Sequence, residues 1–439
     1  MLSYTLRVMK AGKNSVHLVG IGGVGMSALA QALLDGGATV SGSDRLLDGG
    51  DATETLQCLR RQGVALYPQD GSAIRPGLSR LVVSSAIEPG NPDLLAAKRH
   101  NVPVVHRARE LADLTAERRL IAVTGTSGKS SVTAMLAWLL AEAGLDPQVI
   151  NGAAVCGWDE QGTRIGSVRA GRGDWAVIEA DESDRSLLGY APAHAIITNR
   201  SADHFDAAET DRVFDAFRGR VGGTVIEDQP PDDALLPARG WHSGFHFEGV
   251  TFEIPLPGRH NGCNAWQAVR LARELGLDTH ALARSLARFP GVERRLQRVG
   301  VCGGATVIDD YAHNPAKLAA AWQTVAGVFP RIAGVWRPHG YAPLRNNLDE
   351  LAATFIRSLR PQDRLYVLPV YDAGGTARRD VNAHDLVDRL TPCGVSAAVV
   401  PDLETAEARL RLDAQAATAL LVCGARDPGL PRLARRLAS

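Results

Sequence analysis

The sequence predicts an α/β protein in which parallel sheets are covered by crossover helices. Short β-rich apolar runs alternate with longer stretches of helical period along the whole chain. Two glycine-rich turns, at 20–25 and 125–129, each join a strand-like run to a helix-like stretch and indicate two separate nucleotide-sized units. The length of 439 residues favours about two to four domains, each with its own core.

The expected elements follow from these runs. Buried strands are predicted at 16–20, 81–84, 121–124, 176–179, 195–198, 332–336, 365–369 and 420–423. Helices are predicted at 26–34, 130–143, 264–275 and 348–359, where apolar residues recur at helical spacing. A charged, helix-like stretch at 108–119 and a charged run at 293–298 each precede a new strand. We therefore expect domains at 1–114, 115–296 and 297–439.

The composition excludes several classes of protein. The 48 basic and 48 acidic residues cancel, so neither a nucleic-acid binder nor a polybasic membrane binder is predicted. No apolar run approaches the ~20 residues that span a bilayer, and the first residues lack the apolar core of a signal peptide. The six cysteines lie far apart, which favours reduced thiols. We expect a cytoplasmic protein with no nucleic-acid or membrane partner.

The first glycine-rich turn, 20–25, has the GxGxxG pattern between a strand and a helix. Its glycines let backbone N–H groups approach a pyrophosphate at a helix N-terminus, and Asp44 at the end of the next strand can hold a ribose hydroxyl. Tight packing of the helix on the strand explains the same pattern without a ligand. By itself the turn is weak evidence for a nucleotide site.

The second turn, 124–131, reads TGTSGKSS and differs from the standard Walker A spacing. It offers N–H donors, one cation and a hydroxyl at the start of a helix, which suits a nucleoside triphosphate. We expect Lys129 on the β- and γ-phosphates and Ser130 on Mg²⁺. Lysine occurs at only five positions in the chain, so an incidental exposed lysine in this turn is the weaker explanation.

Acidic residues gather where the strand at 176–179 ends, since Glu179, Asp181, Glu182 and Asp184 fall within six positions. Like charges at one strand end repel unless a cation neutralises them, which predicts Mg²⁺ there. A solvated acidic loop is the alternative. His204 follows the next strand and can add a ligand to the same site, although a structural role is the better explanation of this histidine by itself.

Three further polar segments stand beside predicted strands and helices. Asn261 and Asn264 carry the amides that can read an adenine edge, and helix capping by Asn261 is the alternative. The segments 308–315 and 336–341 follow strands, and the carboxyl ends of strands mark the ligand-facing edge of such sheets.

Together and in this order, the motifs resemble the Mur ligases, the ATP-dependent amide-forming enzymes of peptidoglycan precursor synthesis. The resemblance covers nearly the whole chain and is strongest at 20–26, 43–44, 179–184, 257–264, 309–315 and 338–339. Within the family it points to the branch that joins L-alanine to UDP-N-acetylmuramate, with the tripeptide-recycling ligases as near relatives. It implies a Rossmann-like N-terminal domain for the UDP-sugar, a central P-loop-type ATPase domain and a Rossmann-like C-terminal domain that closes over the cleft.

The resemblance also implies an activity and its residues. The nucleotide-sugar carboxylate would react with ATP to an acyl-phosphate, which an amino acid's amine then attacks, with Mg²⁺ or possible Mn²⁺ as the metal, in a monomer or weak homodimer. Lys129, Glu179, His204 and His313 are the implied catalytic residues, and Ser130, Glu179 and His204 the metal ligands. The implied ATP site comprises Gly125, Thr126, Ser127, Gly128, Lys129, Ser130, Ser131, His260, Asn261, Asn264, Arg295 and Asp310. The implied UDP-sugar site comprises Gly22, Gly23, Val24, Gly25, Met26, Ser27, Asp44, Ser84, Ser85, Ala86 and Arg107. The implied amino-acid site comprises Tyr311, His313, His339 and Arg345.

The chain departs from the family's patterns at several positions. Ser127 replaces a histidine in the ATP loop, and Asn314 replaces a second histidine. Two arginines that the family associates with the amino acid's carboxylate are missing from the segment 338–345. Either Arg345 or Arg337 takes their place, or the acceptor or the acid donor differs, which predicts a divergent member.

Two other interpretations stay open from the sequence. An NAD-dependent oxidoreductase would use the turn at 20–25 and Asp44, but it leaves Lys129, Glu179 and His204 without a role. A non-catalytic nucleotide-binding paralogue would explain the missing arginines. The joint presence of Lys129, Ser130, Glu179 and His204 counts against it, because a lost activity would let such a set erode.

Overall fold

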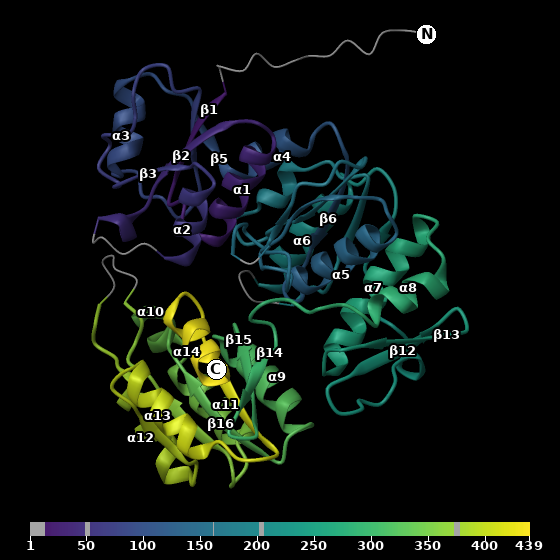
Figure 1. The fold of residues 1–439 in the computed structure, drawn as a ribbon, viewed down its shortest axis with the longest axis vertical. Coiled ribbons are helices and arrows are strands. Elements are labelled where there is room, and N and C mark those ends of the chain that lie inside the picture. Colours follow the sequence, from purple (N-terminus) through teal and green to yellow (C-terminus); the bar gives the residue numbers. More distant parts are fainter. Residues whose placement is uncertain (1–13, 49–52, 161, 202–205, 373–377) are drawn as a thin grey trace. The chain divides into compact units, whose positions relative to one another are not determined.

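The computed structural model describes residues 14–48, 53–160, 162–201, 206–372 and 378–439. These described residues form two compact units, one within 14–235, 245–252 and 262–290, the other within 236–244, 253–261 and 291–439. Three separate β-sheets, each accompanied by helices, confirm the predicted α/β fold class (Figure 1). Within the described ranges, no helix has the length and apolar character needed to cross a bilayer.

The first sheet is parallel throughout, in the order β3-β2-β1-β4-β5. Its strands are β1 (Ser15–Val19), β2 (Thr39–Ser43), β3 (Ala65–Tyr67), β4 (Arg80–Val83) and β5 (Val104–His106). Its helices are α1 (Val24–Asp35), α2 (Glu54–Arg61), α3 (Pro92–Arg99) and α4 (Arg107–Thr115), with a short 3₁₀ turn η1 (Arg45–Leu47). The carboxyl ends of the parallel strands therefore meet at one edge.

The second sheet has the order β11-β10-β6-β9-β7-β8 and is parallel except for the β7–β8 pair. Its strands are β6 (Arg119–Thr124), β7 (Gln148–Ile150), β8 (Val168–Arg169), β9 (Trp175–Glu179), β10 (His194–Ile197) and β11 (Val225–Ile226). The accompanying helices are α5 (Lys129–Glu142), α6 (Ala207–Arg218), α7 (Arg259–Glu274) and α8 (Thr279–Leu286), with 3₁₀ turns η2 (Ser186–Gly189) and η3 (Asp232–Ala234). A separate hairpin consists of β12 (Ser243–Phe247) and β13 (Val250–Ile254).

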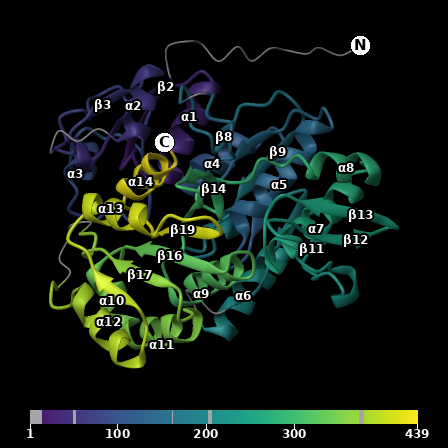
Figure 2. The same ribbon diagram turned by 60° about the horizontal axis from the view of Figure 1, so that its bottom comes forward.

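The third sheet has the order β14-β15-β19-β16-β17-β18, with only the β14–β15 pair antiparallel. Its strands are β14 (Gln297–Cys302), β15 (Ala305–Asp310), β16 (Arg331–Trp336), β17 (Arg364–Val367), β18 (Ala397–Val399) and β19 (Thr418–Cys423). Its helices are α9 (Pro315–Ala326), α10 (Tyr341–Asn346), α11 (Leu348–Ser358), α12 (Ala383–Leu390), α13 (Leu403–Asp413) and α14 (Gly429–Ala438), with the 3₁₀ turn η4 (Thr391–Cys393). Helices α13 and α14 cover one face, and α9, α11 and α12 the other (Figure 2).

The apolar runs become strands because helices bury both faces of each sheet. Leu120 to Thr124 of β6 are all buried, as are Ala176 to Ile178 of β9 and every residue of β19. All eight predicted strands and all four predicted helices are present, with ends shifted by a few residues. None of the six cysteines, all in described segments, forms a disulfide. The domain limits at 114 and 296 stay predictions.

His17 is a buried titratable group in the middle of β1. Its Nδ1 lies 2.9 Å from the Ser41 hydroxyl, while its buried Nε2 has no partner among the described residues. Burial lowers the pKa of His17 to about 4. The folded protein therefore holds the ring neutral at a pH where the unfolded chain already binds a proton.

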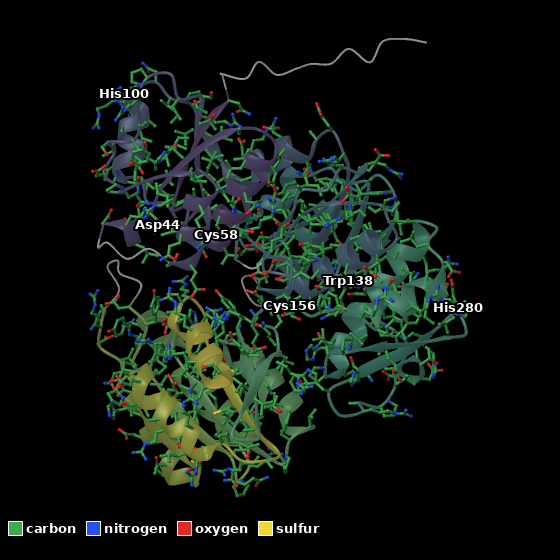
Figure 3. The ribbon with its side chains drawn as sticks, viewed as in Figure 1. Asp44, Cys58, His100, Trp138, Cys156 and His280 are labelled. Carbon is green, nitrogen blue, oxygen red and sulfur yellow. The ribbon has the colours of Figure 1, made fainter. Side chains whose placement is uncertain are left out.

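Stability is expected to fall as the pH drops from 6.5 through 4, by up to about 3 kcal/mol for this group. Urea unfolding at several pH values measures the loss, and His17→Gln should flatten the profile. His280→Gln is the control, because His280 is exposed at the start of α8 (Figure 3). An equally steep profile in His17→Gln would assign the pH dependence to other groups.

Candidate active site

The loop between β6 and α5 has the geometry of a phosphate-binding turn. Gly125 has φ +122°, and a Cβ there would lie 2.2 Å from the Thr198 hydroxyl, so no side chain fits. Gly128 precedes α5 with φ +85°, and a Cβ there would lie 2.7 Å from Oδ1 of Asn264. The glycines therefore permit close contacts with β10 and α7, and α5 begins at Lys129 with its N-terminus at the loop.

Residues after β10 hold this loop in one shape. The Thr198 hydroxyl donates to the Ser127 carbonyl at 2.6 Å, and Nδ2 of Asn199 donates to the same carbonyl at 2.8 Å. The Thr126 hydroxyl donates to the Ser201 carbonyl at 2.7 Å. Thr198 and Asn199 were not among the site residues expected from the sequence. Their signal was a polar pair directly after a buried strand that neighbours β6.

Lys129 is held by two oxygens of the same domain. Its Nζ donates to the Gly125 carbonyl at 2.8 Å and pairs with Oε2 of Glu182 at 2.6 Å. Glu182 is buried and Lys129 is partly buried, and Oε1 of Glu182 has no partner within the described segments. The acidic run was expected to attract a metal, but this member of it is the counter-ion of Lys129.

Asp181 lies between two cations. Burial alone would raise the pKa of Asp181, but the charge of Lys129, hydrogen bonds from Ser183 and the charge of Arg107 together lower it. The carboxylate is therefore ionised at neutral pH. It links the ATP loop electrostatically to Arg107 at the start of α4.

Glu179 and Ser130 are brought together by Asn151 and Gly152, which follow β7. The Gly152 N–H donates to Oε2 of Glu179 at 2.9 Å, and a Cβ on Gly152 would lie 2.4 Å from that oxygen. Nδ2 of Asn151 donates to the Ser130 carbonyl at 3.1 Å. Sequence reasoning missed Asn151 and Gly152, whose signal was an Asn-Gly pair after a buried strand.

Hydroxyl and carboxylate oxygens are suitable ligands for Mg²⁺, so Ser130 and Glu179 fit the expected metal. His204, the third expected ligand, lies outside the described residues. Across 14–48, 53–160, 162–201, 206–372 and 378–439, no three His, Cys, Asp or Glu side chains converge as a complete metal site. Phosphate oxygens and water usually complete such a Mg²⁺ shell, which fits a small protein contribution.

The GxGxxG turn of the first domain is organised by Asp44 (Figure 3). Oδ2 of Asp44 accepts from the Gly22 N–H at 2.8 Å, and Oδ1 accepts from the Leu46 N–H at 3.0 Å. Asp44 is buried, so its carboxylate shapes the turn and caps η1. Asp44 was expected to hold a ribose hydroxyl, and that role stays a prediction. A ribose hydroxyl would have to share the carboxylate oxygens with these two N–H groups.

The other expected UDP-sugar residues differ in accessibility. Met26 and Ser27 are buried, whereas Val24 is exposed at the first turn of α1, after Gly23. Ser84, Ser85 and Ala86 follow β4, at the edge where β1 also ends.

A Cβ on Gly25 would lie 3.1 Å from the Arg107 guanidinium, which places this cation against the turn. Oδ2 of Asp184 lies 3.5 Å from the Ser85 hydroxyl, so the acidic run also reaches this group.

The two asparagines of α7 differ. Asn264 lies against Gly128 of the ATP loop, where an amide can meet a nucleotide. The buried Asn261 donates to the Pro257 carbonyl at 2.7 Å, and α7 begins before it, at Arg259, so Asn261 lies inside the first turn and is not its N-cap. His260 is exposed beside it.

Asp309 and Asp310 end β15 inside the third domain. Burial raises the pKa of Asp309 to about 6, and burial also raises the pKa of Asp310. Oδ2 of Asp310 accepts from the Leu296 N–H at 2.8 Å, and Oδ1 accepts from the Ala312 N–H at 2.7 Å. Asp310 therefore ties the segment before β14 to the end of β15. The expected parts of Asp310 and Arg295 in the ATP site stay predictions, and Arg295 lies over the Tyr311 ring.

His313 and His339 meet beyond β15 and β16, with ring centroids 4.8 Å apart. Nδ1 of His313 lies 2.9 Å from the Tyr311 carbonyl, which can only accept, so Nδ1 carries the proton and Nε2 is the basic nitrogen of the neutral ring. Burial, with the charges of His313, Arg426 and Lys317, lowers the pKa of His339 to about 4. Both rings line a small pocket whose other walls include Trp336, Pro343, Leu344, Asn347 and Leu351.

The two arginines considered for the acceptor's carboxylate have partners already. Nε of Arg345 donates to Oδ1 of Asp380 at 2.9 Å, and its Nη2 donates to the Arg378 carbonyl at 2.6 Å. Nη1 of Arg337 pairs with Oδ2 of Asp427 at 2.7 Å, and its Nε donates to the Pro369 carbonyl at 3.0 Å. Each guanidinium therefore already has a carboxylate of the third domain as its counter-ion.

Comparisons with known proteins agree along the chain. Three family models match: the catalytic domain of the Mur ligase family over 15–119, the Mur ligase middle domain over 123–218 and the Mur ligase glutamate ligase domain over 294–426. The UDP-N-acetylmuramate–L-alanine ligase of Rhodopseudomonas palustris is 37% identical over 406 residues, covering 82% of this chain and 83% of the relative. The ligase of that name from Acidithiobacillus ferrooxidans is 34% identical over 453 aligned positions, covering 93% and 94%.

Solved structures show the same likeness. The crystal structure of the UDP-N-acetylmuramate–alanine ligase MurC from Thermotoga maritima matches with a TM-score of 0.79 at 26% identity, over 96% of this chain and 98% of that one. The three sheets, the glycine-rich turns that begin α1 and α5 and the identity shared with these relatives therefore have one explanation. The chain belongs to the Mur ligase family.

Proposed function

We propose that this protein joins an amino acid, L-alanine in the first instance, to the carboxylate of UDP-N-acetylmuramate at the expense of ATP. The observation that carries the proposal is the ATP loop with its Lys129–Glu182 ion pair and neighbouring Glu179, in a chain that resembles alanine ligases over most of its length. The dehydrogenase alternative rested on Asp44, whose carboxylate is occupied by the GxGxxG turn itself.

The proposed chemistry has two steps. A carboxylate oxygen of the acid attacks the γ-phosphorus of ATP, the bond to the β-phosphate oxygen breaks, and an acyl-phosphate and ADP form. The amine nitrogen then attacks the acyl carbon, the carbon–oxygen bond to phosphate breaks, and an amide and phosphate form. Lys129 would neutralise charge on the transferred phosphoryl group, and Nε2 of His313, the basic nitrogen of the neutral ring, would take the amine's proton.

The metal and the nucleotide would be held by residues around the ATP loop. Mg²⁺, which Mn²⁺ can replace, would supply charge neutralisation at the phosphates when bound by Ser130, Glu179 and His204. The loop residues 125–131 would bind the phosphates, and Asn264 would lie closest to the adenine side of the nucleotide. In the first domain, Gly25, Val24 and Arg107 would form the side of the turn that faces the uridine diphosphate.

We further propose that the protein acts in the cytoplasm as a monomer or weak homodimer, with small molecules as its only substrates. The functional division at 1–114, 115–296 and 297–439 is part of this proposal. Each domain would bind one ligand: in chain order, the UDP-sugar, ATP and the amino acid.

The test is phosphate release from ATP and Mg²⁺ by the purified protein, with UDP-N-acetylmuramate crossed against a panel of amino acids and small amines. Mass spectrometry of the products identifies any new amide. We expect release only with the complete mixture and the largest rate with L-alanine. ATP binding without release for any pair would contradict the proposal and favour a non-catalytic paralogue.

A further inference from the structure

The carboxylate of the proposed acceptor needs a positively charged partner in the third domain. An amino acid carries a carboxylate beside its reacting amine, and a carboxylate removed from water needs a cation or several hydrogen-bond donors. His313 and His339 line a pocket whose other walls are mostly apolar. Arg337 and Arg345 are both engaged by carboxylates and carbonyls of the same domain.

Arg426 stands at the same edge of the third sheet. Cys423, the last residue of β19, pairs with Asp310 of β15 on one side and with Trp336 of β16 on the other. The segment after β19 therefore emerges between the segments that carry His313 and His339. Arg426 is exposed, and no other described residue makes a hydrogen bond or an ion pair with it.

The turn that carries Arg426 is fixed and unfavourable for an arginine. Oδ2 of Asp427 pairs with Arg337 at 2.7 Å, and its Oδ1 accepts from the Gly429 N–H at 2.7 Å. Arg426 itself has φ +64°, a left-handed conformation that glycine adopts more easily. A large side chain in such a conformation, with no partner among the described residues, indicates that the side chain has a use.

The electrostatic surroundings suit an anion. Besides burial and His313, the charges of Arg426 and Lys317 both lower the pKa of His339, so these cations lie within range of the ring. Arg426 and Arg337 act in the same direction on the neighbouring Tyr371, whose pKa is nevertheless raised by burial and by Asp427. Besides His313, the charges that act on the His339 ring are thus those of two cations, while His339 itself is neutral at pH 7.

We propose that Arg426 binds the carboxylate of the acceptor amino acid beside the His313–His339 pair. The inference rests on the proposed function, because it assumes an amino acid as the acceptor. It makes Arg426 the residue that separates an amino acid from an uncharged amine of the same shape.

The decisive experiment compares L-alanine, or whichever amino acid the panel identifies, with its carboxamide in the full-length protein and in Arg426→Gly. Glycine tolerates the left-handed backbone, so this variant should fold at least as well as the parent. We expect KM for the amino acid to rise about 10- to 100-fold, since a charge-assisted hydrogen bond to the carboxylate is lost. KM for the carboxamide and kcat for both acceptors should change less than about twofold.

Two further variants test whether the change in KM comes from the charge at position 426. Arg426→Lys keeps the charge and should recover part of the preference for the amino acid. Arg409→Ala removes an exposed arginine of α13 and should leave both acceptors unchanged. Equal rises in KM for the two acceptors, or no rise for either, would overturn the proposal, because only a carboxylate contact predicts a selective loss.

A second readout does not depend on turnover. The ring signals of His339 can be followed by NMR while L-alanine or its carboxamide is added together with UDP-N-acetylmuramate and a non-hydrolysable ATP analogue. A response to L-alanine that Arg426→Gly abolishes supports the contact even in a protein that forms no amide, which would contradict only the proposed function. The same response in parent and variant would contradict the contact.

Discussion

Lys129→Ala is expected to lower kcat/KM for ATP about 1,000-fold, because the variant loses the cation nearest the transferred phosphoryl group. It should also lower the free energy of unfolding by about 3 kcal/mol, since Glu182 stays buried without its partner. Affinity for UDP-N-acetylmuramate, measured by calorimetry without ATP, should be nearly unchanged. If the variant lost both ATP turnover and affinity for UDP-N-acetylmuramate, the two nucleotide sites would not be separate.

A double variant distinguishes lost chemistry from lost stability. In Lys129→Ala/Glu182→Gln, the buried carboxylate becomes a neutral amide, so most of the lost unfolding free energy should return while turnover stays low. Lys98→Ala, which removes an exposed lysine of α3, is the control and should change neither quantity. Recovery of turnover in the double variant would show that Lys129 acts only by stabilising the loop.

Gly125→Ala is expected to raise KM for ATP by at least about 100-fold, the second large effect. The added Cβ would meet the Thr198 hydroxyl and the backbone nitrogens of Thr198 and Asn199 at 2.2 Å, 2.8 Å and 3.0 Å. The loop must then move away from β10, and the contacts of Ser127 with Thr198 and Asn199 break. Nucleotide titration and steady-state kinetics measure the change.

Gly144→Ala is the matched control for that variant. Gly144 lies just beyond the other end of α5 with φ +78°, and no atom lies within 4 Å of a Cβ built there. It should cost only about 1 kcal/mol of stability from the left-handed backbone and leave KM for ATP unchanged. If both variants raise KM equally, the strained backbone is responsible and the close approach to Thr198 is not.

Much of the fold follows from local sequence. The strands at 121–124, 176–179 and 420–423 were predictable because a run of apolar residues of that length is stable only when both faces of a sheet are covered. The positions of the two glycine-rich turns were also predictable, since their spacing and left-handed glycines are properties of a few consecutive residues. Before any contact is known, these patterns place Glu179 at a strand end, Lys129 at the start of a helix and His313 just after a strand.

The partners of those residues depend on the tertiary structure. Lys129 pairs with Glu182, which is 53 positions away, and the Ser127 carbonyl is bound by Thr198, 71 positions away. Four acidic residues in six positions look alike in sequence, and only burial and distance select Glu182 for the lysine, Glu179 for Gly152 and Asp184 for Ser85.

The same reason applies to charged residues whose partners within the folded chain could not be read from the sequence. Asp44 and Asp310 have the residue type and the strand-end position of ribose ligands, yet the folded chain supplies backbone N–H groups to both carboxylates. Arg337 and Arg345 have the charge that an acceptor's carboxylate needs, and Asp427 and Asp380 neutralise them. The sequence by itself determined which chemical groups reach the carboxyl edges of the sheets, because hydrophobic period and glycine spacing are local properties. Only the tertiary structure decided which of those groups keep their charge for a ligand, because hydrogen bonds and ion pairs join residues that are distant in the chain.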